Sequence, residues 1–304
     1  LIKGENITLF SPQDVPGLYD TFFTDQDKFQ ELYEKAERMT SIRKKSMPAI
    51  ELFSSFMQER KDTGRIYLMN VDHANTHGAF VEEVAPIKQS NLCCEIDLPT
   101  KPLKHINDDE GEISLCTLSA INWGAIKSLE QMEKVCDLAV RALDELLDYQ
   151  EYPIEAARVS TMNRRPLGIG IINFAYWMAK NEMTYTQPDL EMIDEFAEAW
   201  SYYLIKASAD LAEEQGACLW SDQTKYHNGL TPNQTYKQDV DELVPHKERM
   251  PWRELRDQLK RTGIRNSTLM ALMPAETSAQ ISNATNGIEP PRSLVSVKQS
   301  KHGI

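Results

Sequence analysis

Apolar side chains recur at helical spacing along much of the chain. In the stretch from Ser128 to Tyr149 they occupy one face of a 3.6-residue period, at positions 129, 132, 135, 136, 139, 143, 146 and 147. The same spacing predicts four further helices: over 27–37, from Pro48 to a stop at Gly64, over 190–215 before Gly216, and over 252–261 before Gly263. Helices separated by short β-like runs therefore dominate the predicted structure.

Short apolar runs between these helices predict buried strands. One covers 65–71, and a second covers 264–273 and leads into a new helix. Helix–strand alternation of this kind favours an α/β sheet or barrel. Gly168 and Gly170 precede a predicted helix without a proper strand before them, so we interpret them as allowing close backbone packing rather than as a dinucleotide-binding loop. The stretch 220–251 is rich in polar and turn residues and is predicted to be a surface excursion.

Composition and charge narrow the classes of protein. Of the 304 residues, 41% are hydrophobic and 26% are charged, which is ordinary for a soluble globular enzyme. The net charge of −13 argues against a nucleic-acid-binding surface, although backbone N–H groups at a helix start can still hold a phosphate. The longest apolar run, 169–179, is too short to span a bilayer, and no signal peptide is evident. Five cysteines are typical of a cytosolic protein, and both ends of the sequence look cut.

The chemically informative segment covers 90–100 and reads Ser-Asn-Leu-Cys-Cys-Glu-Ile-Asp-Leu-Pro-Thr. In an extended conformation alternate side chains share a face. Two faces result, one with Asn91, Cys93 and Glu95, the other with Leu92, Cys94 and Ile96. The first face presents an amide, a thiol and a carboxylate, so Cys93 is predicted to be the chemically active cysteine and Cys94 the packed one. Taken alone, the segment also fits a structural pair of thiols, because free cysteine is often simply buried.

A wider set of motifs changes this interpretation. They are Leu-Cys-Thr-Leu-Ser at 115–119, Arg-Arg-Pro-Leu-Gly-Ile-Gly at 164–170, a stretch from Trp252 to Pro274 that includes Leu255, Gly-Ile-Arg-Asn at 263–266 and Met-Ala at 270–271, then Pro-Ala-Glu-Thr-Ser at 274–278, and Asn-Ala-Thr-Asn-Gly-Ile-Glu-Pro-Pro-Arg at 283–292. Together with Asn-Leu-Cys-x-Glu at 91–95, the set resembles the large (α) subunit of class I ribonucleotide reductases. The resemblance covers essentially the whole chain.

The resemblance implies both a fold and an activity. Members of that family build a ten-stranded α/β barrel around a finger loop that carries the catalytic thiol. The chain, 1–304, would be part of one such catalytic barrel domain, with the finger loop at about 90–124. The N-terminal half of the barrel, the ATP-cone domain and the C-terminal tail would lie outside it. The implied activity is reduction of ribonucleoside 5′-diphosphates to their 2′-deoxy forms.

The resemblance also implies roles for residues of the finger loop. Cys93 matches the transient thiyl radical, which abstracts the hydrogen on the ribose C3′ carbon. Glu95 matches the base that takes the 3′-hydroxyl proton, and Asn91 matches the amide that positions the substrate and this carboxylate. Cys116 matches one of the two reducing thiols, whose disulfide partner lies upstream of Leu1 in the family and is absent here.

Substrate contacts and partners follow from the same resemblance. Glu276, Thr277 and Ser278 match residues that contact the substrate, and hydroxyl and free N–H groups at a helix start would hold its diphosphate. An ordinary Ser/Thr helix cap uses the same groups. No metal or cofactor is expected to bind this chain directly. The radical would come from a metal-containing small subunit, electrons would come from thioredoxin or glutaredoxin, and nucleotide effectors would bind elsewhere in the subunit. Two large subunits would form a homodimer in the cytoplasm, with no nucleic-acid or membrane partner.

Several other features are interpreted as structural. His73 and His77 have the spacing of a helical metal pair, but Ala74 stands where a metalloprotease motif needs glutamate. Cys218 is assigned no role. Packing roles are predicted for Tyr202 and Tyr203, inside an amphipathic helix, and for Cys136 on an apolar helix face.

Two alternatives remain open. A glycyl-radical enzyme can also carry adjacent cysteines on a finger loop, but that class does not explain Asn91, Glu95 and Cys116 together. Alternatively, the chain is one part of a split or truncated subunit and needs a complementary polypeptide before it is active.

Overall fold

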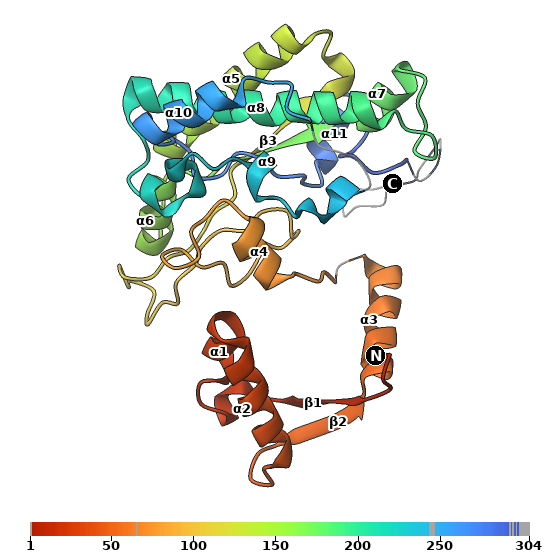
Figure 1. Cartoon of the computed structure of the whole chain (residues 1–304), viewed down its shortest axis with the longest axis vertical. Coiled ribbons are helices and arrows are strands. Elements are labelled where there is room, and N and C mark those ends of the chain that lie inside the picture. Colours follow the sequence, from red (N-terminus) through yellow and green to blue (C-terminus); the bar gives the residue numbers. More distant parts are fainter. Residues whose placement is uncertain are drawn as a thin grey trace. The chain divides into compact units, whose positions relative to one another are not determined.

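The computed structural model of the chain (Figure 1) describes residues 2–64, 66–242 and 247–291, together with 293, 295 and 297. These residues form two compact units, Leu1–Asp72 and His73–Ile304. Arg65 and Arg292, which belong to segments named above, lie outside the described residues.

The first unit combines a two-stranded sheet with helices. Strands β1 (Asn6–Phe10) and β2 (Lys44–Pro48) pair antiparallel, and helices α1 (Leu18–Thr24) and α2 (Gln26–Arg38) connect them. The Asp25 side chain caps α2 at its first turn. A small core is buried here, formed by Val15, Leu18 and Ala36, with Phe10, Phe29, Leu32, Tyr33 and Ile42 packed around it. Helix α2 confirms the helix predicted over 27–37.

Helix α3 (Ala49–Thr63) begins one residue later than predicted and ends as predicted at Gly64, whose φ of 66° is left-handed. The buried strand predicted after it is wrong. Residues 66–70 have no regular structure, helix α4 (Val71–His77) follows directly, and Leu68 is 69% exposed. The run is apolar enough for a strand, but within the described residues no strand edge pairs with its backbone.

The second unit is built on two parallel strands with helices packed against them. Strands β3 (Leu118–Asn122) and β4 (Gly168–Ile172) pair in register over their full length. The long helices α5 (Leu129–Tyr149) and α8 (Leu190–Gln215) lie side by side and run past β3 in Figure 1. Both confirm the predicted helices, and the Ser128 side chain caps the first turn of α5.

Shorter elements complete this unit. Its other helices are α6 (Glu155–Arg164), α7 (Phe174–Lys180), α9 (Pro232–Thr235), α10 (Trp252–Thr262) and α11 (Glu276–Ile281). Helix α10 confirms the prediction that ended at Gly263. The stretch from 220 is irregular as predicted, but it is more than a surface excursion, because Thr224 and Tyr226 are fully buried.

The strand predicted over 264–273 is confirmed only in part. The Leu167 N–H donates to the Thr268 carbonyl at 3.0 Å and the Ile169 N–H donates to the Leu269 carbonyl at 2.7 Å. The segment therefore runs parallel along β4, although it makes a single regular bridge. Helix α11 follows it, as predicted.

Gly168 and Gly170 allow this segment to approach β4 closely. A Cβ atom added at Gly168 would lie 2.5 Å from Leu118 Cδ2 and 2.9 Å from Ala271 Cβ, and one at Gly170 would lie 2.5 Å from the Ala271 carbonyl oxygen. No side chain fits at such distances. The interpretation of these glycines as close-packing positions is confirmed.

The two faces of this sheet have different neighbours. Ile169 and Ile171 belong to the main core, which also contains Met132 and Leu147 of α5 and Leu204 of α8. Side chains alternate along a strand, so the glycine positions of β4 face the other way. There a Cβ at position 168 would lie 3.6 Å from Ile96 Cδ1. Ile96 of the finger loop therefore packs on the face of β4 opposite to Ile169 and Ile171.

The mixed α/β fold class is confirmed. The described part of the chain contains two two-stranded sheets and, beside β4, the segment 264–273, which is called the strand-like segment below. These elements do not close into a barrel.

Candidate active site

The fingertip segment, 90–97, forms a tight turn. Ser90 and Asp97 make an antiparallel bridge, so the chain reverses direction between them. The Cys94 N–H donates to the Asn91 carbonyl at 3.1 Å, and the φ of Cys94 is 59°, in the left-handed region. The predicted extended conformation with alternating faces is therefore wrong.

The Asn91 side chain explains this fingertip turn. Its Oδ1 accepts a hydrogen bond from the Glu95 N–H at 3.0 Å and another from the Ile96 N–H at 3.2 Å. A side-chain oxygen that binds nearby backbone N–H groups offers them an alternative to the ladder of a strand. Because Oδ1 is engaged in this way, Asn91 presents its amide nitrogen to other groups.

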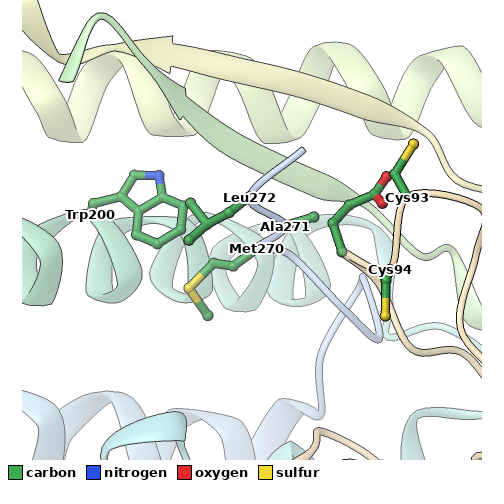
Figure 2. A pocket seen from close by; sticks show the side chains of 7 residues that line it. Cys93, Cys94, Trp200, Met270, Ala271 and Leu272 are labelled. Carbon is green, nitrogen blue, oxygen red and sulfur yellow. The ribbon is translucent and has the colours of Figure 1, made fainter. Parts of the chain in front are cut away.

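The two adjacent thiols lie on opposite sides of the fingertip turn. Figure 2 shows the side chains of Cys93 and Cys94 pointing away from one another. The prediction that Cys94 is simply packed is wrong, because both cysteines are half-buried and both line the same cavity. Leu92, which was expected to pack on the same face as Cys94, is 90% exposed.

The fingertip turn faces a cavity of about 450 Å³, which is large enough for a small-molecule ligand. Its wall combines the turn with α8 and with the strand-like segment beside β4 (Figure 2). The lining residues are Cys93, Cys94, Glu95, Trp200, Met270, Ala271 and Leu272. Sequence reasoning missed Trp200, since a tryptophan in an amphipathic helix carries the signal of an ordinary core residue. Met270 and Ala271 do belong to the signature stretch of the resemblance that runs from Trp252 to Pro274.

Glu95 supplies the carboxylate of this site. One of its oxygens, Oε2, is buried and accepts no hydrogen bond from any described residue. Such an oxygen is costly to leave without a partner, which is typical of a group that serves a ligand or a reaction. Burial and then the charge of Glu95 raise the pKa of the Cys93 thiol above its ordinary value. The thiol of Cys93 is therefore kept protonated at neutral pH.

Cys116 approaches the fingertip turn from a separate arm of the chain, two residues before β3 begins. Cys116 as a residue is exposed, but partial burial of its thiol raises the pKa of that group, and the charge of Glu95 raises it further. The Asn91 side chain opposes this rise through a hydrogen bond, and the charge of Cys93 adds to it. These interactions require all four groups to lie near one another. The structure thus brings together Asn91, Cys93, Glu95 and Cys116.

The remaining cysteines lie in the core. Cys136 of α5 and Cys218 are both buried, and burial raises the pKa of each thiol to about 12. The predicted core role of Cys136 is confirmed. Neither thiol lines the cavity.

Glu276, Thr277 and Ser278 form the exposed first turn of α11. The Asn286 Oδ1 accepts hydrogen bonds from the Ala275 N–H at 2.7 Å and the Glu276 N–H at 3.0 Å, and so holds the start of this helix. The three residues do not line the cavity. They follow the strand-like segment that does.

His77, Tyr202 and Tyr203, which were interpreted as structural residues, contact other parts of the second unit. His77 Nδ1 lies 2.7 Å from the Thr235 carbonyl oxygen, and within the described ranges no group of three His, Cys, Asp or Glu side chains is arranged to hold a metal ion. Tyr202 is buried against Trp252, with ring centroids 5.2 Å apart, and Tyr203 is partly buried, so the predicted packing roles are confirmed. Of the helices that the structure describes, none has the length and apolar character needed to cross a membrane.

Fold and site together define an α/β protein with clustered thiols and a carboxylate beside an open cavity. The sequence pattern of the ribonucleotide reductase barrel domain matches residues 1–304, and the chain belongs to this family. It is 60% identical to ribonucleoside-diphosphate reductase 1 subunit alpha of Salmonella typhimurium and 58% identical to ribonucleoside-diphosphate reductase subunit alpha of Haemophilus influenzae, each over 305 residues. It is 46% identical over 307 residues to the corresponding subunit of Enterobacteria phage T4. These alignments cover 99–100% of this chain and 40% of each relative, so the chain spans about 40% of the length of the curated relatives it matches.

Proposed function

We propose that this chain forms part of the catalytic large subunit of a ribonucleoside-diphosphate reductase, which converts ribonucleoside 5′-diphosphates to 2′-deoxyribonucleoside 5′-diphosphates. One observation carries the proposal. The Cys93 thiol and the Glu95 carboxylate line one cavity, and the Asn91 amide and the Cys116 thiol interact with them, in a chain of the ribonucleotide reductase barrel family. The names of its relatives support the same activity.

Cys93 would begin the reaction as a thiyl radical. The sulfur takes the hydrogen atom from the ribose C3′ carbon, which forms an S–H bond and leaves a carbon radical. Because the two bonds are close in strength, this step is reversible. Glu95, with its unpaired Oε2, would take the 3′-hydroxyl proton while the 2′-hydroxyl leaves as water. The raised pKa of the Cys93 thiol fits this role, since only the protonated thiol can give a hydrogen atom back to C3′ at the end.

Cys116 would be one of the two thiols that reduce the substrate. Two thiols lose two hydrogen atoms and close into a disulfide, so that one ribonucleotide and one dithiol become one deoxyribonucleotide, one disulfide and one water. Cys136 and Cys218 are buried and do not line the cavity. We place the second reducing thiol outside these 304 residues because the resemblance implies it, and Cys94 does not match that partner in the family either. Thioredoxin or glutaredoxin would reduce the disulfide again.

Substrate binding and assembly complete the proposal. The hydroxyls of Thr277 and Ser278, together with Glu276, would contact the substrate at the exposed start of α11. A metal-containing small subunit would generate the radical, nucleotide effectors would bind elsewhere in the large subunit, and two large subunits would pair. The 304 residues would form part of one ten-stranded barrel domain with the finger loop at 90–124. Because free dithiols persist in reducing compartments, we place the reaction in the cytoplasm.

The direct test measures formation of dCDP from CDP by the complete subunit, its small subunit and a dithiol. Cys93→Ser should abolish turnover, because a serine O–H bond is too strong for the hydroxyl to replace the thiol. The matched control is Cys94→Ala, which removes the neighbouring thiol. Continued turnover in Cys93→Ser would refute the proposed role.

A second measurement concerns assembly. We expect the isolated chain to be inactive, and activity to appear when it is mixed with the missing part of the barrel and the small subunit. Turnover by the isolated chain with the small subunit alone would contradict the view that it is only part of the barrel.

A further inference from the structure

The two arms that carry Cys93 and Cys116 meet at one point of the finger loop, where Lys101 and Glu112 form an isolated antiparallel bridge. This bridge is called the crossing below. The Lys101 N–H donates to the Glu112 carbonyl at 3.1 Å, and the Glu112 N–H donates to the Lys101 carbonyl at 3.0 Å. The arm that leaves the fingertip turn therefore ends where the returning arm begins. Cys116 follows four residues after this crossing. Whatever fixes Glu112 in space also fixes where the returning arm starts.

A buried arginine holds this crossing point. The Arg164 guanidinium at the end of α6 donates to the Glu112 carboxylate, and the side chain of Arg164 is only 3% exposed. The same guanidinium donates to Gln223 Oε1 at 3.1 Å and stacks over the Trp220 ring at 4.4 Å. Its backbone carbonyl accepts a hydrogen bond from the Ser267 N–H at 3.0 Å, at the start of the cavity-lining segment. Arg164 thus joins the crossing to a wall of the cavity.

Helix α6 secures the returning arm at two further points. The Ile113 N–H donates to the Ala156 carbonyl at 3.2 Å. The Ser114 hydroxyl donates to the Pro99 carbonyl on the outgoing arm at 2.5 Å and lies 3.5 Å from the Ser160 hydroxyl. Both arms are therefore tied to α6 within a few residues of the crossing.

We propose that the ion pair between Arg164 and Glu112 is a positioning element, which sets the separation of the Cys93 and Cys116 thiols by fixing the point where their two arms cross. Arg164 belongs to a motif of the sequence that the proposed chemistry does not otherwise use. The inference deepens the proposed function, because that function gives the separation of the two thiols its purpose. It stands on the geometry of the finger loop.

The charge of Glu112 is required for this role. Burial of the guanidinium lowers the pKa of Arg164, and the charge and hydrogen bond of Glu112 oppose that effect. Glu112→Gln keeps the shape of the side chain but leaves the cation buried without its anion. The crossing should then shift or loosen. Arg164→Lys keeps a cation but loses the flat guanidinium that contacts Glu112, Gln223 and Trp220 at once.

The experiment measures cross-linking of Cys93 to Cys116 in the complete subunit by a short bifunctional thiol alkylator, in a Cys94→Ala background that removes the competing thiol. Trypsin places the two cysteines in different peptides, 89–104 and 105–127, so mass spectrometry identifies the cross-link directly. The matched control is Glu155→Gln, which breaks a half-exposed ion pair with Arg158 on the same helix.

We expect Glu112→Gln to slow cross-linking by about tenfold relative to single alkylation of each thiol, because a displacement near 1 Å has large effects on proximity-dependent reactions. Arg164→Lys should give a smaller loss, and Glu155→Gln none. Labelling of the buried Cys136 and Cys218 reports whether each variant is folded. If Glu112→Gln unfolds, Arg164→Lys decides the question.

Equal cross-linking rates in the wild type and in folded variants of the pair would overturn the inference. The cross-link needs no turnover, so its outcome is separate from that of the proposed function. A chain that shows the expected loss but forms no dCDP would keep the positioning element and lose the reductase assignment. Turnover of CDP by the wild type, together with unchanged cross-linking in the variants, would keep the reductase assignment and lose the positioning element.

Discussion

Asp144→Asn should strongly destabilise the second unit, because Asp144 is the buried centre of an ion-pair network. Its carboxylate accepts hydrogen bonds from Arg165 Nε at 2.7 Å, Asn266 Nδ2 at 2.9 Å and Arg265 Nε at 3.1 Å. The side chain of Asp144 is 2% exposed, and that of Arg165 is 5% exposed. Asparagine keeps the shape but leaves two arginines in the interior without this anion.

The magnitude follows from this burial. Removing one partner of a buried ion pair costs about 3–5 kcal/mol of unfolding free energy. For a unit of this size, that corresponds to a fall in melting temperature of about 6–20 °C. The matched control is Asp148→Asn, because Asp148 binds the same Arg165 but its side chain is 46% exposed. The loss of unfolding free energy there should be at most about 1 kcal/mol.

Tryptophan fluorescence during chemical denaturation is the suitable assay. All five tryptophans of the chain lie at position 123 or beyond, so the signal reports the second unit alone. If Asp144→Asn and Asp148→Asn lose the same free energy, the argument that burial makes Asp144 the essential partner is wrong.

Three further predictions concern the thiols. Cys116→Ser should allow little more than a single turnover with a dithiol reductant, as measured by dCDP formed per subunit, and sustained turnover would exclude it as a reducing thiol. Cys94→Ala should keep dCDP formation within about threefold of wild type, since its sulfur points away from that of Cys93; loss of activity in Cys94→Ala but not in Cys93→Ala would reverse the assignment. Glu95→Gln should lower the pKa of the Cys93 thiol, because it removes a negative charge that raises it. Alkylation of Cys93 followed against pH should then shift to lower pH while staying above the ordinary thiol range, since burial remains, and an unchanged profile would contradict the electrostatic argument.

The long helices were predictable because each carries its own evidence. Helices α5 and α8 bury one face of a regular pattern, and Ser128 and Gly216 mark a start and an end. Such signals are local and need no knowledge of the rest of the fold. The strand expected over 65–71 failed for the opposite reason, because a strand depends on a neighbouring edge that sequence alone does not reveal.

The candidate site was predictable as a set of residues but not as a shape. The motifs around Cys93 and Cys116 identified the groups that the structure gathers. The alternation argument failed because Asn91 binds the backbone of the fingertip turn itself, and a pattern of residue types does not show that competition. Trp200 was missed because a cavity wall and a core position give a helix the same apolar signal.

The fingertip turn has a consequence for how this chain folds. Its shape is closed by hydrogen bonds among residues 91–96, so Cys93 is presented by an element whose own hydrogen bonds are local. Such an element can take its final geometry early in folding and then be enclosed as the surrounding walls arrive.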